Sequence, residues 1–323
     1  MRIIHKNRKI HTMIQKLASA FRRTVSGSDE GRPSWVKEIE ACEGPGLFGP
    51  DSAVWEVHGS VATLIGGIRA LLMQAAHPAA LSGVKSHSRY ETDLLGRLQG
   101  TSKWLAITTF GPKSMIEREA ARVNAMHERV KGFYRDKGGF EKPYIAKDDR
   151  FLLWVHCAFT ESFLEAHLLC KYPINTSPDS YVKEWSESAK PLGLNLAPQS
   201  HLELRNEINR FLLEELAYSR DTEEVIKFIL NPPFGFFAKL FFTPLAKSAV
   251  RSLSSAEREL LHLKNPGRIW EIIARSNLWW HTFRFHLISR GKLVGLDFKR
   301  KVFSNSQEDE SESRTIRRGH FSP

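Results

Sequence analysis

Cysteine is scarce in this chain, with only three among 323 residues. Cys42, Cys157 and Cys170 form neither a Cys-x-x-Cys pair nor a Cys-x-x-Cys-His motif. The spacing therefore gives no support for a disulfide framework, a zinc knuckle or a covalently attached c-type haem. Such cysteine usage is typical of a reducing compartment, so we expect a cytoplasmic protein.

The chain also lacks an apolar run long enough to cross a bilayer, which takes about 20 residues. The most apolar window, residues 64–76, is shorter and is interrupted by Arg69. A second window, residues 225–250, is rich in phenylalanine but contains three prolines, which helix interiors avoid. We expect it to form either a buried turn between helices or the wall of a hydrophobic substrate channel. Arg22-Arg23 is followed by polar residues instead of the apolar core of an export signal.

Acidic residues are absent from residues 1–28, which carry seven lysines and arginines. On a helix the apolar residues of this segment share one face; they are Ile10, Met13, Ile14, Leu17 and Phe21. Two interpretations stay open: peripheral contact with an anionic membrane, or docking on the protein's own core. The net charge of +11 does not predict a nucleic-acid partner, because the basic residues are spread out and no nucleic-acid-binding motif accompanies them.

The composition and periodicity predict an all-α protein with a single large helical domain and room for a buried cofactor pocket. Hydrophobic side chains make up 41% of the chain, enough for a large core. Residues 54–76 are apolar almost all round and predict a central buried helix. Gly66-Gly67 in its middle would allow close approach by another backbone or a flat ring. We expect a basic segment (1–40), one large helical domain (41–299) and a polar disordered tail (300–323).

His127 lies in the middle of an apolar helical stripe. Ser114 and Glu117 match a capping pattern at the start of the helix. The stripe repeats at three- and four-residue steps and consists of Ile116, Ala120, Val123, His127, Val130 and Tyr134. A histidine placed in this way is either a core residue with satisfied ring nitrogens or a metal ligand. Arg97 and Thr101, four residues apart, share one face of another predicted helix.

A series of short motifs resembles one known catalytic domain. In order they are Trp55-Glu-Val-His58, Ala76-His77-Pro78, His87-Ser-Arg-Tyr90, Arg97-x-x-x-Thr101, Phe110-Gly111, His127-x-x-Val130-x-Gly132, Tyr144-x-Ala146-x-Asp148 and Trp154-Val-His156. Their order and spacing, over about residues 45–295, are similar to the domain shared by the fungal oxygenase of mycophenolic acid biosynthesis and the bacterial latex clearing proteins.

The resemblance implies an all-helical fold that binds haem b non-covalently through one axial histidine, and cleavage of isoprenoid double bonds with dioxygen. Carried over by position, it implies that His127 is the axial iron ligand. It places the family's motif arginine and threonine at Arg97 and Thr101. Arg97 would pair with a haem propionate or polarise bound oxygen, or else pin two helices as a buried ion pair.

Two departures separate this chain from the rubber-cleaving branch of that family. Gly100 stands where that branch has a lysine, and residues 57–90 contain no acid that could serve as the upstream base. His77, before Pro78, is the nearest candidate for a distal acid–base group; the alternative is a histidine bonded to local carbonyls at a helix end. His156 is either a second iron ligand, a partner of the first ligand, or an ordinary core histidine.

The sequence thus predicts a haem-dependent oxygenase acting on a hydrophobic, isoprenoid or lipid, small molecule. One alternative is an all-α haem or lipid carrier that kept the fold without the chemistry. A less favoured one is a non-haem di-iron oxidase, which needs Glu-x-x-His pairs on facing helices. His281 and His286 are five residues apart and do not share a helix face.

Overall fold

The computed structural model describes residues 34–276, apart from positions 61, 88–89, 173, 175–176 and 274; the side chains of residues 84–99, 237–238 and 241 also lie outside the description. The described chain is predominantly helical, as the sequence predicts, with one two-stranded sheet. Its elements are α2 (Ser34–Ala41), α3 (Ala53–His58), α4 (Thr63–Ala75), α5 (Pro78–His87), α6 (Tyr90–Phe110), α7 (Lys113–His127), β1 (Lys131–Arg135), β2 (Glu141–Ile145), α8 (Asp149–Leu169), α9 (Pro178–Ser186), the 3-10 helix η1 (Glu187–Leu192), α10 (His201–Glu214), α11 (Arg220–Leu230), α12 (Phe236–Ser252) and α13 (Ser255–Leu260).

Serine hydroxyls fix where many of these helices begin. The N-terminal N–H groups of a helix have no partner within it, and a serine at the cap accepts one of these bonds. At α11 and α13 the third helical residue also bonds back to the cap, which completes a capping box. The capping serines are Ser52, Ser177, Ser200, Ser219 and Ser254.

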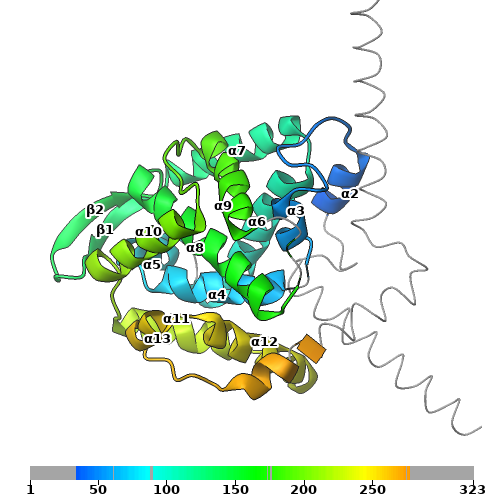
Figure 1. Ribbon diagram of the computed structural model, residues 1–323. Helices are drawn as coiled ribbons and strands as arrows, with labels where there is room; N and C mark the ends of the chain where they lie inside the picture. Colours follow the sequence, from blue (N-terminus) through cyan, green and yellow to red (C-terminus); the bar gives the residue numbers. More distant parts are fainter. Residues whose placement is uncertain are drawn as a thin grey trace, which may run out of the picture.

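Helix α4 lies at the centre of the fold, between α8 on one side and α11 and α12 on the other (Figure 1). Gly66 permits the close approach of α8, because a Cβ there would lie 2.6 Å from Phe163 Cδ1 and 3.1 Å from Ser162 O. The prediction that a glycine in this helix admits another backbone is therefore confirmed. Gly67, by contrast, has no atom within 4 Å of such a Cβ.

A buried ion network ties α4 to α8, α10 and α13. Arg69 donates to Glu161 Oε2 at 2.8 Å and to Glu257 Oε2 at 2.9 Å, and all three side chains are fully buried. Arg69 also donates to Ser162 Oγ at 3.0 Å, and Glu161 accepts a further bond from Arg205. Two carboxylates and two guanidinium groups thus balance in charge inside the fold, which is the condition for burying such groups.

Two of the predicted helices are wrong in their extent. The predicted helix over residues 54–76 is divided into α3 and α4, because the chain turns at Gly59 and Ser60. The predicted stripe from Ile116 to Tyr134 ends at His127, and the residues after it enter β1. The predicted cap at Ser114 is also wrong: α7 starts at Lys113, after Pro112, with no side-chain cap bond.

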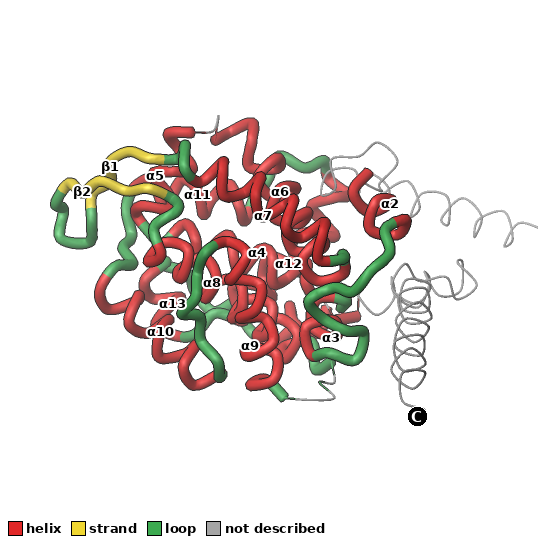
Figure 2. Tube along the Cα trace, turned by 90° about the horizontal axis from the view of Figure 1, so that it is seen from above, coloured by secondary structure: helices red, strands yellow, loops and turns green. Residues whose placement is uncertain are grey.

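The strands β1 and β2 form an antiparallel hairpin that the sequence analysis missed. It lies at the edge of the molecule in both views (Figures 1 and 2). Gly132 disfavours continuation of the helix, while Asp136-Lys-Gly-Gly139 supplies the turn, with Gly139 at φ +83°. Tyr144 is buried on the inner face of the hairpin.

Helical periodicity in the sequence also predicts helices over residues 149–171, 180–190, 200–219, 255–262 and 266–287. Residues 149–171 give α8, 180–190 give the end of α9 and η1, 200–219 give α10, and 255–262 give α13. Residues 225–250 form the end of α11, a proline turn and most of α12, which contains Pro244. The segments 1–28 and 300–323 and most of 266–287 lie outside the described residues. No helix in the described part of the chain is long and apolar enough to cross a membrane.

Candidate functional site

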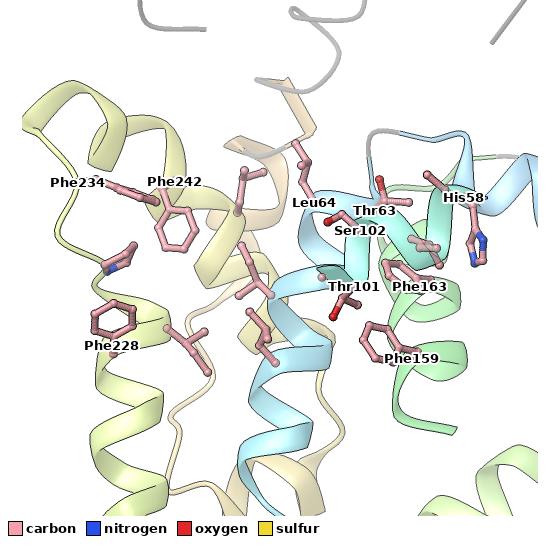
Figure 3. Close-up of a pocket in the computed structure, with 18 of the residues that line it drawn as sticks. His58, Thr63, Leu64, Thr101, Ser102, Phe159, Phe163, Phe228, Phe234 and Phe242 are labelled. Atoms are coloured by element: carbon pink, nitrogen blue, oxygen red, sulfur yellow. The ribbon is translucent and has the colours of Figure 1, made fainter. Parts of the chain in front are cut away.

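A cavity of about 250 Å³ lies beside the central helix and is the candidate site. Its walls come from α4, α6, α8, α11 and α12, so segments far apart in the sequence surround one space. Most of the lining is aliphatic or aromatic (Figure 3), which includes Ile68, Leu71, Leu105, Phe110, Phe159, Phe163, Phe228, Phe234, Phe242 and Leu245. The predicted alternative that residues 225–250 form the wall of a hydrophobic channel agrees with this placement.

The polar side chains of the lining are few and uncharged. Thr63 starts α4, while Thr101 and Ser102 are consecutive in α6. Figure 3 shows these three hydroxyl groups between the aromatic groups at the two ends of the cavity. No carboxylate, lysine or arginine lines the cavity among the described residues. Such a site favours an apolar ligand that carries at most a few hydrogen-bonding groups.

His58, at the end of α3, also lines the cavity. Its Nδ1 lies 2.8 Å from Thr109 Oγ1 and its Nε2 lies 2.9 Å from the Tyr181 hydroxyl. Burial, with a smaller contribution from the charge of His167, lowers the pKa of His58 to about 3. Because both ring nitrogens have partners and the ring stays neutral, His58 is a fixed wall of the cavity. In the sequence, His58 stands out only as part of the Trp55-Glu-Val-His58 motif.

Of the predicted site residues whose side chains the structure describes, one lines the cavity. Thr101 lines it directly. Arg97 lies one turn earlier on α6, but its side chain is outside the described part of the chain. His77, His127 and His156 are not among the lining residues.

His77 lies at the junction of α4 and α5, with both ring nitrogens engaged. Nδ1 accepts from the backbone N–H of Ala79 at 3.2 Å, so Nε2 carries the proton and donates to Glu215 Oε2 at 3.2 Å. Arg150 donates to the other Glu215 oxygen at 2.6 Å. Burial raises the pKa of Glu215, but the bonds from His77 and Arg150 outweigh it and lower that pKa overall. This arrangement fixes the helix junction.

His127 and His156 lie on two helices that both approach η1. His127 ends α7, and Asn124, one turn earlier, donates to Pro191 O at 3.1 Å. His156 lies on α8, and Leu152, one turn earlier, packs against Ala189. His127 is half-buried, so its predicted position inside an apolar stripe is only partly realised.

His156 has a buried ring nitrogen that lacks a hydrogen-bond partner among the described residues. This nitrogen is Nε2, and the side chain is 91% buried. Burial lowers the pKa of His156 to about 4, so the imidazole is neutral at physiological pH. On α8 it precedes Phe159 and Phe163 on the face that lines the cavity. Buried polar atoms rarely stay unpaired, which makes this nitrogen a candidate for contact with a ligand.

The described residues give no support to a di-iron site. No three His, Cys, Asp or Glu side chains gather in a metal-binding group within the described ranges. One Glu-x-x-His pair, Glu259 and His262, escaped the sequence analysis. His262 lies beyond the end of α13 with φ +53° and stacks on Tyr218 at 4.0 Å, so the pair does not share a helix face.

Comparison with known protein families identifies a match for most of the chain. The family model described as "ER-bound oxygenase mpaB/B'/Rubber oxygenase, catalytic domain" matches residues 55–281, which is more than half of the chain. It covers every residue that lines the cavity, from His58 of α3 to Leu245 of α12. No curated protein and no solved structure matches the chain.

Proposed function

We propose, from the premise that the chain belongs to the mpaB/rubber oxygenase catalytic-domain family, that it is a haem b-dependent oxygenase acting on a hydrophobic substrate. The oxygenase class follows from the family, whereas the haem and the substrate are our proposal. The observation that carries the proposal is an apolar, uncharged cavity within the matched region, with Thr101 of the family's motif in its wall.

The residues that would hold the haem come from α6, α7 and α8. By its place in the family motif, His127 would bind the haem iron. His156 would either hydrogen-bond to the cofactor or bind its iron. Among the described residues, His156 Nε2 and Asn124 Oδ1 are buried without a hydrogen-bond partner, which supports a polar or metal-bearing group near η1. A neutral imidazole is the form that binds iron, and burial keeps His156 in that form.

The chain's own residues bind and orient the reactants, while haem supplies the redox chemistry that activates dioxygen. Arg97 would pair with a propionate through a charge-assisted bond. Thr101, which lines the cavity, would form a hydrogen bond beside Arg97. The aromatic walls, including Phe159 and Phe163, exclude water and hold the apolar substrate. We assign no acid–base role to His77, because both of its ring nitrogens are engaged.

Absorption spectra of the purified protein, as isolated and after dithionite, test the haem assignment. We expect a Soret band in the parent that His127→Ala loses. His156→Ala should keep haem but with weaker affinity or a shifted band. His201→Ala is the matched control, since His201 is partly exposed on α10 and should leave the spectrum unchanged. A normal haem spectrum in His127→Ala would contradict the ligand assignment.

A lipid carrier is the second candidate, because the described lining of the cavity offers binding groups and no acidic or free basic catalyst. Gly100 also stands where the rubber-cleaving branch has a lysine. Oxygen consumption separates the two functions. Haem-loaded protein that consumes oxygen in the presence of apolar substrates and a reductant is an oxygenase. Protein that binds those lipids without turnover is a carrier.

A further inference from the structure

The outer face of α12 carries large apolar side chains in contact with solvent. Phe236 is 77% exposed and Leu240 is 68% exposed. Spacings of three and four residues place them on one helical face together with the exposed Lys239 and Lys247 and the half-exposed Thr243. We call these five residues the α12 outer face.

The charge around this face is of one sign. Residues 225–256 contain four basic residues and no acidic residue. Lys227 is paired with Glu223, and Arg251 with Glu271. Lys239 and Lys247 form no ion pair with any residue that the structure describes. The two lysines therefore leave a net positive charge beside Phe236 and Leu240.

The opposite side of the same helix forms a wall of the cavity. Phe242 and Leu245 line the cavity from α12, and Phe234 lines it from the preceding turn. Phe234 and Phe242 pack edge to face at 5.3 Å (Figure 3). The helix thus separates the cavity from whatever covers its outer face.

We propose that the α12 outer face docks on an anionic lipid surface. A helix with exposed apolar groups between lysines, and no acid, matches the chemistry of a membrane interface, where apolar side chains enter the acyl boundary and lysines meet anionic headgroups. A lipid surface fits better than an acidic protein, because the acyl boundary would remove both of these bulky, exposed apolar side chains from water. Docking here would place one wall of the cavity against the layer in which apolar molecules dissolve. The proposal holds whether or not the chain binds haem.

An environment-sensitive fluorophore at position 240 tests the contact. The full chain carries Leu240→Cys in a Cys42→Ser background, because Cys157 and Cys170 are buried. Leu202→Cys on α10, where Leu202 is 70% exposed, is the matched control. We expect a blue shift at position 240, and none at 202, on vesicles of phosphatidylcholine with phosphatidylglycerol. Lys239→Gln/Lys247→Gln should weaken vesicle binding by about fivefold per lysine.

Three results would overturn the proposal. Vesicles that bind the protein without a shift at position 240 would place the contact elsewhere, for example at residues 1–28. A probe at 240 that is already blue-shifted in the free protein would show that another part of the chain covers the face. Equal binding by the double lysine variant would show that the charge has no role.

Discussion

Replacing Arg69 with methionine should destabilise the fold by about 3 to 5 kcal/mol at pH 8, the usual cost of removing one partner of a buried ion pair. Methionine keeps most of the volume, so the loss reports on charge and hydrogen bonding. In the parent, Arg69 donates to Glu161, Glu257 and Ser162. Without it, Glu161 keeps Arg205, whereas Glu257 loses the cation that faces it.

The loss of stability in Arg69→Met should be smaller at pH 5.5 than at pH 8. Burial, against the opposing charge of Arg69, raises the pKa of Glu257 to about 6. Its pKa in the unfolded chain is about 4.3. The folded state therefore holds more protons between these values, and the contribution of Glu257 to stability falls as pH rises through this window. Without Arg69 the folded pKa rises further, so protonation relieves part of the loss at pH 5.5.

Urea unfolding at pH 8 and pH 5.5 measures the effect. Arg69→Met/Glu257→Gln should recover part of the stability at pH 8, because the unpaired carboxylate is gone. Arg220→Met removes an exposed ion pair with Glu224 and should cost nothing measurable. A loss below about 1 kcal/mol for Arg69→Met, or a loss that is equal at both pH values, would refute the reasoning.

Three further substitutions test the packing of α4 on α8 and the partners of His58. Gly66→Ala should lower the free energy of unfolding by about 2 kcal/mol or more, because its Cβ would clash with the backbone and ring of Phe163. Gly67→Ala should be neutral or should stabilise the fold by up to about 1 kcal/mol. Equal thermal midpoints for these two variants would contradict the packing of α4 on α8. Tyr181→Phe should cost about 1 to 3 kcal/mol in chemical unfolding by leaving His58 Nε2 buried and unpaired; an unchanged unfolding midpoint would disprove that role.

Local patterns in the sequence predicted the parts of the fold that depend on neighbours along the chain. The long apolar stretch of α8 and the glycine pair of α4 were predicted because a helical face shows itself at three- and four-residue spacing. The hairpin was missed because Val130 and Tyr134 also fit the helical stripe, and only pairing of β1 with β2 selects the extended form. Strand preference depends on such partners more than on the residues themselves.

The candidate site, like the fold, was predictable from the sequence only in part. Motif order alone identified the family and drew attention to Thr101, which lines the cavity. It could not reveal that His58 is held by Thr109 and Tyr181, since those partners come from α6 and α9.

The sequence by itself determined the helical class, the family and the residue types available for chemistry, because these follow from composition, periodicity and motif order. Only the tertiary structure decided which of those residues face one cavity and which, like His77, have both ring nitrogens engaged. It also decided that His156 has a buried nitrogen with no hydrogen-bond partner among the described residues. Hydrogen-bond partners and burial arise from contacts between distant segments, such as α4 with α8 and α12. Those contacts are absent from any local window of the chain.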